Sequence, residues 1–500
     1  MRTFALITLW MAVLLVGCSS GPREIVIFYT SDIHGRFLPE PKVMGEDTIQ
    51  LGGFAALSGY MNEIKKQNRN TLYLDAGDLM TGNPICDIKY IGVYGGALIH
   101  FLEMLHCEAF ALGNHEFDKG AEEAHNFVDA GSFPMLCANL VEKGGSEPVF
   151  TPYTIIKRGG IRIGVIGLIL ADFDKIVSKP GAEPFEVLDP ARTAQRYIDQ
   201  IDPETDLIIL LTHQGLDNDR RLAWSVRNAD LIIGGHSHER VDTPELVNNI
   251  YVTQAGPYCK RLGVIRATVA EDTLSSLSGE LVPLVLENTE PAPLVQAFSD
   301  SIQAVIDSMY GAEIATTRVP LIRQYDTSCN LGNLLCDLLR ARYKTDVAFA
   351  NSGGIRKDLE PGPIRKLDIV EMLPFMNSVV LFEASGEELM KTARQQARVQ
   401  GEESGEILQM SGMEIKYRND NGITTVDEVK IGGNLLVQDR IYTVAAHDYI
   451  TNSQPDQYLK FIPQNAYSTG ELFSSVIIEE IEKSPHPLSA DARPRLERIR

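Results

Sequence analysis

The stretch ALGNHEFDKG, residues 111–120, follows an apolar run and places Asn114, His115, Glu116 and Asp118 within five positions. Neighbouring side chains on a strand point to opposite faces, so this stretch cannot form one flat polar patch. It is therefore either an ordinary turn between a strand and a helix or part of a reaction centre. The rest of the sequence has to decide between these two interpretations.

Polar residues follow four further apolar runs in the same way. Continuous runs of this kind, separated by amphipathic segments such as 54–67, are typical of buried strands in a sheet covered by helices. Because open α/β sheets bind ligands at the carboxyl ends of their strands, these turns are expected to meet at one edge of a single sheet. Asp32 and His34 follow VIFYT, Asp78 follows LYLDA, His213 follows IILLT, and His236 and His238 follow LIIGG.

With Asn114, these positions offer two carboxylates, four imidazoles and one amide oxygen. The set is too large for one tetrahedral ion and fits two ions that share a bridging ligand. Asp78, the lone carboxylate after its strand, is the expected bridge. Centres with two ions bind both the attacking and the leaving oxygen of a phosphoryl displacement. Since none of the motifs contains cysteine, the pattern favours catalytic Zn²⁺, Mn²⁺ or similar ions over a structural zinc site.

In this order, SDIHG, GDLMTG, GNHEFD, THQG and GHSH resemble the motifs of the calcineurin-like metallophosphoesterases, and GNHEFD is similar to the 5′-nucleotidase and UDP-sugar hydrolase family. The resemblance covers nearly all of the mature chain. It implies a four-layer α/β/β/α N-terminal domain, a linker helix and a mixed α+β C-terminal domain.

The same resemblance implies a role for most of the site residues. His115 would face the phosphate as the catalytic residue, and Asp118 would reach back one helical turn to orient its imidazole. Glu116 has no implied role and is expected to be exposed to solvent. One metal ion would take Asp32, His34, Asp78 and His238, and the other would take Asp78, Asn114, His213 and His236.

The second half of the chain contains NSGGIR, LPFMN, LQMSG and YTVAAHDYI, which resemble the C-terminal domain of the same family. The glycines of NSGGIR allow the backbone to approach a ligand closely, and the planar guanidinium of Arg356, assisted by Asn351, suits a phosphate. The resemblance makes Phe375 a stacking platform for a nucleobase, with Asn377 beside it, whereas the sequence alone equally allows Phe375 a place in the core. Asp456 falls where the family binds a sugar hydroxyl.

The chain departs from the family pattern at two places. It reads NSQPDQY at 452–458, where family members carry GGDG before an aromatic residue, so Tyr449 and Tyr458 are both candidates for the second stacking aromatic. No arginine lies directly before CNLGN (329–333), and Arg323 is the candidate substitute. Both departures bear on the choice of substrate and leave the expected chemistry unchanged.

The two ends of the chain are expected to lie outside the folded domains. Residues 1–17 have the features of a signal peptide, and LVGCSS resembles a lipobox in which Cys18 is lipidated and 18–23 form a tether. The alternative is a plain signal peptide with an incidental cysteine. The predicted divisions are a metallophosphoesterase domain at 24–288, a linker helix at 289–312, a substrate-binding domain at 313–485 and a loosely held tail at 486–500.

The formal charge of −21 argues against binding of nucleic-acid polymers, whose phosphates are neutralised by lysine and arginine. The six cysteines after Cys18 permit disulfides or buried thiols alike. The leading hypothesis is an exported lipoprotein, anchored at an outer membrane or cell surface, that acts as a 5′-nucleotidase. The alternatives are a UDP-sugar hydrolase, a 2′,3′-cyclic phosphodiesterase with 3′-nucleotidase activity, and a nucleotide-binding lipoprotein without catalysis.

Overall fold

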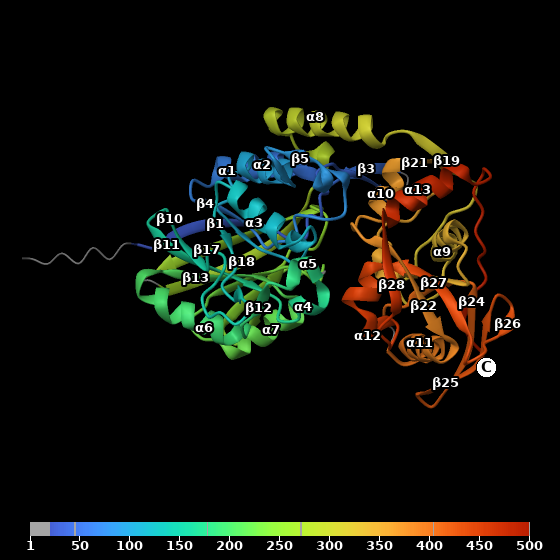
Figure 1. Ribbon diagram of the computed structural model, residues 1–500. Helices are drawn as coiled ribbons and strands as arrows, with labels where there is room; N and C mark the ends of the chain where they lie inside the picture. The colour runs from blue at the N-terminus through green and yellow to red at the C-terminus, as the bar shows by residue number, and fades with distance from the viewer. Residues whose placement is uncertain (1–20, 45–46, 178, 271–272, 404, 500) are drawn as a thin grey trace, which may run out of the picture.

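The computed structural model describes residues 21–44, 47–177, 179–270, 273–403 and 405–499. It comprises an N-terminal domain, the long helix α8 (Pro293–Tyr310) and a C-terminal domain (Figure 1). The predicted signal peptide and the predicted lipidation site Cys18 lie outside the described residues. Within those residues, no helix combines the length and the apolar character needed to cross a membrane.

Two six-stranded sheets form the centre of the N-terminal domain. In the first, β1 runs parallel to β4 and β4 parallel to β7; in the second, β11, β13 and β14 run parallel. The motifs therefore follow strands of two sheets, and the expectation of a single sheet is wrong. The first sheet has the order β18 (Thr273–Pro283), β17 (Arg261–Ala270), β1 (Arg23–Thr30), β4 (Thr71–Asp75), β7 (Ala109–Ala111), β8 (Met135–Leu136); the second has β10 (Tyr153–Arg158), β11 (Ile161–Ile169), β13 (Leu207–His213), β14 (Leu231–Gly234), β16 (Ile250–Gln254), β15 (Glu245–Val247).

Alternation along the strands explains why the sheets stack. In β1, Ile25 and Ile27 pack against residues of the second sheet such as Ile163, whereas Phe28 on the opposite face packs against the helices. The four-layer α/β/β/α arrangement is therefore confirmed. The first sheet is covered by α1 (Gly53–Gln67), α2 (Gly96–Met104) and α3 (Ala121–Ala130), and the second by α6 (Pro190–Ile201) and α7 (Leu216–Ser225).

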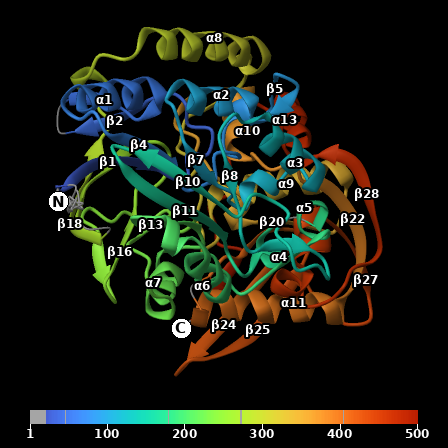
Figure 2. The same ribbon diagram turned by 90° about the vertical axis from the view of Figure 1, so that its left-hand side faces the viewer.

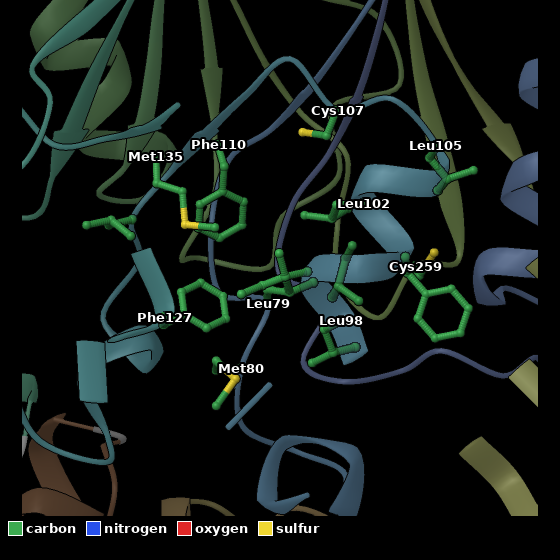
Figure 3. Packing of buried hydrophobic residues seen from close by; sticks show 14 of the residues in the cluster. Leu79, Met80, Leu98, Leu102, Leu105, Cys107, Phe110, Phe127, Met135 and Cys259 are labelled. Atoms are coloured by element: carbon green, nitrogen blue, oxygen red, sulfur yellow. The ribbon is translucent and has the colours of Figure 1, made fainter. Parts of the chain in front are cut away.

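The core on the helix side also anchors the loop after β4. Leu79 and Met80, which directly follow Asp78, are buried among Leu98 of α2 and Phe127 of α3 (Figure 3). Burial of two large apolar side chains stabilises the loop by about 1.5–3 kcal/mol for each of them. The loop that carries Asp78 is thus part of the folded core.

Helix α8 packs against the N-terminal domain. It begins at Pro293, a favourable first residue of a helix because proline has no N–H to leave unpaired. Val295, Ile302 and Ile306 lie on one face at helical spacing and join the core of α1 and α2, and Figure 2 shows α8 lying above these two helices.

The C-terminal domain is built on a five-stranded sheet between two layers of helices. Alternate residues of β20 separate the two cores: Ala348 packs towards α9 and α13, and Phe349 packs towards α11. The sheet has the order β23 (Leu408–Ser411), β20 (Val347–Asn351), β27 (Ile441–His447), β22 (Ser378–Ser385), β28 (Gln464–Leu472); the helices are α9 (Asn330–Tyr343), α10 (Lys366–Met372), α11 (Gly386–Arg398) and α13 (Phe473–Lys483).

The last residues are held in this domain, so the prediction of a loosely held tail is wrong. Strand β29 (Leu496–Arg498) pairs in parallel with β24 (Met413–Asp420), and Leu496 is buried. Arg495 donates hydrogen bonds to Asp337 and to the backbone carbonyl of Met410. A three-residue strand has too few alternating positions to be recognised in the sequence.

The six cysteines from Cys86 to Cys336 are all buried free thiols in the described part of the chain. The cysteine count allows either disulfides or buried thiols, and the structure has buried thiols at these six positions. Burial raises the pKa of Cys86, Cys137 and Cys259 to about 12, so these thiols stay protonated and unreactive at neutral pH.

Buried His447 at the end of β27 makes the C-terminal domain sensitive to acid. Its ring packs against Phe473, its Nδ1 has no partner among the described residues, and burial lowers its pKa to about 3. Because the unfolded chain takes up this proton near pH 6.5, the contribution to stability is complete above that pH and is lost progressively as the pH falls towards 3.

We expect protonation of His447 in the unfolded chain to lower the unfolding free energy by about 2 kcal/mol when the pH falls from 7 to 5. In His447→Leu the difference between denaturant unfolding curves at the two pH values should shrink by that amount. An unchanged difference would show that His447 titrates normally in the folded protein.

Candidate active site

The two stacked sheets bring the ends of five strands together. All seven predicted metal ligands lie at this edge, and Asp32, His34, Asp78, Asn114 and His213 are buried there. Backbone hydrogen bonds join the loops: the amide of Asp32 donates to the carbonyl of Gly77, and the amide of His236 donates to Oδ1 of Asp32 at 2.7 Å. The loops after β1, β4 and β14 are therefore held as one unit.

Five of the seven residues have a left-handed backbone conformation. Such positive φ angles are uncommon outside glycine, and they persist where the surrounding structure determines the conformation, often at functional sites. The loops thus direct these side chains inward at a cost in backbone energy. The φ angles are 52° for Asp32, 51° for His34, 57° for Asp78, 81° for His236 and 58° for His238.

The side chains fit two metal ions. Nε2 of His34 lies 2.8 Å from Nε2 of His238, while Nδ1 of His34 faces backbone carbonyls, so both Nε2 lone pairs can point at one ion. Burial lowers the pKa of His236 and of His238 to about 4, which keeps these rings neutral, as metal ligands must be.

Oδ2 of Asp32 is buried and has no hydrogen-bond partner among the described residues. Nε2 of His213 is also buried without a hydrogen bond of good geometry, and its near neighbour is Oδ2 of Asp78 at 3.0 Å. Unpaired buried polar atoms are rare in folded proteins, and a bound ion would satisfy both. Close groups of ligand atoms are formed by Asp32, His34 and His238; by His34, Asp78 and His115; and by Asp78, His213 and His236. Asp78 belongs to two of the three groups, as a bridging ligand would.

His115 begins the short helix η2 (His115–Phe117), and its ring lies beside the metal ligands. Its Nδ1 is 2.6 Å from Oδ2 of Asp118, and its Nε2 is 3.9 Å from Oδ2 of Asp78. Burial opposes protonation, but the carboxylates of Asp118 and Asp78 outweigh it and raise the pKa of His115 to about 9. In the metal-free chain the imidazole is therefore positively charged at neutral pH, and Asp118 lies beside its Nδ1, as the family resemblance implies.

Glu116 is buried, so the expectation of an exposed side chain is wrong. One carboxylate oxygen accepts hydrogen bonds from the amides of Leu79 and Met80, and the other accepts them from the amides of Asp78 and Gly113. Glu116 thereby ties the loop after β4 to the loop after β7. The motif contained no sign of this role because all four partners are backbone groups.

We expect Glu116→Gln to lower the unfolding free energy by about 2–6 kcal/mol. The amide nitrogen cannot accept hydrogen bonds, so two buried N–H groups lose their acceptor at about 1–3 kcal/mol each. Metal affinity should fall about 10- to 100-fold, as for other residues that support ligands. Denaturant unfolding and calorimetric metal titration measure the two effects. Glu122→Gln, an exposed glutamate on α3, is the matched control, and equal behaviour of the two variants would contradict the anchoring role.

A cavity of about 1000 Å³ lies between the two domains. One wall carries the candidate metal site and His115. The opposite wall carries Phe375, whose ring centroid is 5.9 Å from that of His115, together with Arg356 of the NSGGIR turn. Phe375 is therefore a cavity residue, and its alternative place in the core is excluded. The substrate-binding candidates on this wall are Asn351, Arg356, Phe375, Asn377 and Tyr449.

Comparison with known proteins agrees with this geometry. Residues 25–240 match the family model described as calcineurin-like phosphoesterase, and residues 312–459 match the model for the 5′-nucleotidase C-terminal domain. Protein 5NUC of Lutzomyia longipalpis is 30% identical over 456 residues, which cover 79% of this chain and 78% of that protein. The chain belongs to the 5′-nucleotidase family of calcineurin-like phosphoesterases. It is an enzyme of the metal-dependent phosphoesterase class.

The similarity to individual family members extends over both domains. A 5′-nucleotidase of Vibrio parahaemolyticus is 27% identical over 543 residues, covering 95% of this chain and 94% of the relative. The crystal structure of a 5′-nucleotidase precursor from Thermus thermophilus superposes with a TM-score of 0.81 at 24% identity, covering 95% of this chain and 99% of the other. The latter likeness establishes the shared two-domain fold.

Three candidates that the family resemblance suggested lie outside this cavity. Asp456 lies on the single turn α12 (Pro455–Tyr458), is exposed and does not line the cavity. Tyr458 is fully buried in the core of the C-terminal domain, so of the two aromatic candidates only Tyr449 lines the cavity. Arg323 is exposed and does not line the cavity.

The cause is the backbone of the altered loop. A π-helical turn at Tyr449–Ser453 and the proline-initiated turn after it place Asn452 and Ser453 at the cavity and direct Asp456 outward. The residues that line the cavity without any sign in the motifs include Tyr325 and Glu406. Glu406 accepts a hydrogen bond from the amide of Gly353 at 2.9 Å, a long-range contact with no local pattern in the sequence.

Proposed function

We propose that this enzyme is a 5′-nucleotidase that hydrolyses nucleoside monophosphates to a nucleoside and phosphate. The observation that carries the proposal is the cavity between the domains, which presents a two-metal ligand set on one wall and Arg356 and Phe375 on the other. The proposal is also supported by the relative from Vibrio parahaemolyticus, which is named a 5′-nucleotidase.

The residues divide the chemistry between them. Asp32, His34, Asp78 and His238 would hold one divalent ion, and Asp78, Asn114, His213 and His236 the other, with Zn²⁺ and Mn²⁺ as candidates. When bound, such ions act as Lewis acids on the phosphoryl oxygens.

The remaining steps belong to the chain's own side chains. His115 donates its Nε2 proton to the leaving 5′-oxygen while Asp118 holds Nδ1. Arg356 and Asn351 bind phosphate or sugar oxygens, and Phe375 and Tyr449 stack on the base, with Asn377 beside them.

The test is a panel of nucleoside 5′-monophosphates assayed for phosphate release with the purified full-length chain, with added Zn²⁺ or Mn²⁺ and with a strong chelator. Release that depends on the divalent ion is the expected result. No release from any nucleotide, or release that survives the chelator, would overturn the proposal.

The position of Asp456 supports a second candidate substrate class. Since Asn452 and Ser453 line this part of the cavity and Asp456 does not, UDP-sugars and 2′,3′-cyclic nucleotides belong in the same panel. A higher kcat/KM for either would assign the enzyme to that reaction. The non-enzymatic alternative, a nucleotide-binding lipoprotein, finds no support because the complete ligand set is present.

Phe375→Ala tests the stacking platform. Base stacking on an aromatic ring contributes about 1–3 kcal/mol, so we expect KM for the nucleotide to rise about 10- to 100-fold. Hydrolysis of 4-nitrophenyl phosphate, which has no base, should change little, and Phe375→Tyr should retain the affinity for the nucleotide. An equal loss on both substrates would place Phe375 in the structural support of the domain.

We further propose that the protein is exported and anchored through a lipid on Cys18. Strand β1 starts at Arg23, at the opposite end from Asp32, so a tether at residues 18–23 would leave the active site facing away from the membrane. Cys18→Ala should move the protein from the membrane fraction to the soluble fraction. Unchanged fractionation of this variant would refute the anchor.

A further inference from the structure

Thr81, the threonine of GDLMTG, has an unusual backbone conformation for its residue type. Its φ angle is 64°, in the left-handed region, where β-branched residues are outliers. Conformations of this kind are retained where the surroundings impose them, and they concentrate at functional sites. Thr81 lies three residues after Asp78 and is largely buried.

The strained residue makes contacts in two directions. Its hydroxyl donates a hydrogen bond of 2.6 Å to Oδ2 of Asp118, the same oxygen that lies 2.6 Å from Nδ1 of His115. Its carbonyl oxygen lies 2.9 Å from Nδ1 of His34. One residue therefore contacts both the pair His115–Asp118 and a candidate metal ligand.

We propose that Thr81 is a positioning residue that aligns His115 for proton transfer to the leaving group. Its hydroxyl holds Asp118, whose carboxylate in turn holds Nδ1 of His115 and leaves Nε2, 3.9 Å from Oδ2 of Asp78, to meet the leaving oxygen. The inference rests on the proposed function, in which His115 protonates the leaving oxygen.

The geometry explains why the hydroxyl matters. The side chain of Asp118 is about one-fifth exposed, so water competes for its carboxylate, and a second contact from within the protein helps to hold it against His115. Thr81 supplies that contact, and the left-handed backbone directs the hydroxyl to Asp118 while the carbonyl faces His34. The contact to His34 comes from the backbone, so replacing the side chain should spare it.

The test compares Thr81→Ala, which removes the hydroxyl, with Thr81→Ser, which keeps it. On a nucleoside 5′-monophosphate, kcat of Thr81→Ala should fall about 10- to 100-fold with little change in KM. On 4-nitrophenyl phosphate, whose leaving group departs without a proton, kcat should change little. Thr81→Ser should restore most of the nucleotide rate, and calorimetric affinity for Zn²⁺ or Mn²⁺ should match the wild type in both variants.

A second measurement reads His115 independently of turnover. In proton–nitrogen correlation NMR spectra of the histidine rings, the wild type and Thr81→Ser should show a strongly deshielded Nδ1–H proton for His115. This signal should be lost in Thr81→Ala. Equal kinetic losses on both substrates, no rescue by serine, or an unchanged His115 resonance in the alanine variant would overturn the inference. A wild type that releases no phosphate from nucleotides would instead overturn the proposed function, and the NMR comparison would still decide the role of Thr81.

Discussion

Asp78→Asn should abolish metal-dependent turnover, lowering kcat/KM by about 1000-fold or more. The Lewis-acid contribution of bound ions amounts to several kcal/mol, and each 1.4 kcal/mol corresponds to a tenfold change in rate. Asp78 is the residue most central to this contribution. Its Oδ2 lies 3.0 Å from Nε2 of His213 and 3.9 Å from Nε2 of His34, and its Oδ1 accepts a hydrogen bond from the amide of His115.

Asparagine keeps the shape of Asp78 but removes the negative charge and turns one oxygen into an N–H donor. Calorimetric titration with Zn²⁺ or Mn²⁺ should therefore show loss of both ions or a large loss of affinity for each. The matched control is Asp456→Asn, the same substitution at an exposed carboxylate outside the cavity, which should leave activity and metal affinity unchanged. Two ions bound by Asp78→Asn with wild-type affinity would show that Asp78 is not the bridge.

The strands of the N-terminal domain could be predicted from the sequence because each is a short continuous apolar run. VIFYT, LYLDA and IILLT all end at the polar residues that the structure brings together. The assignment of those strands to sheets could not be predicted. Hydrophobic runs specify that a strand is buried on both faces, but strand pairing is a long-range property, and β1 and β13 belong to different sheets although their motifs look alike.

The site likewise contains residues that could be predicted from the sequence and residues that could not. Residues that act through their own side chains, such as Asp78 and His115, stood out because titratable groups directly after apolar strands are chemically conspicuous. Glu116 and Thr81 act through backbone groups or through a residue far along the chain, and no local pattern reports such contacts. Asp456 lies outside the cavity because a π-helical turn precedes it, and the motif gives no sign of this turn.

His115→Ala should lower kcat for a nucleotide about 100- to 10,000-fold, the usual contribution of a general acid, and should retain both metal ions. Asn114→Ala should instead weaken the binding of one ion, since Oδ1 of Asn114 lies 2.9 Å from the ring of His236. The two residues are adjacent in the chain, so both substitutions disturb the same loop. Differences between the variants therefore reflect the side chains.

Calorimetric metal titration and single-turnover kinetics with 4-nitrophenyl phosphate separate the two roles. His115→Ala should lose little on this substrate, because its leaving group needs no proton, whereas Asn114→Ala should lose activity on both substrates until excess metal restores it. His115 has one competing role, that of a metal ligand, because one of its ring nitrogens lies close to ligand atoms of His34 and Asp78. Equal metal loss in both variants would make His115 a ligand, and the proton for the leaving oxygen would then have to come from another group in the cavity.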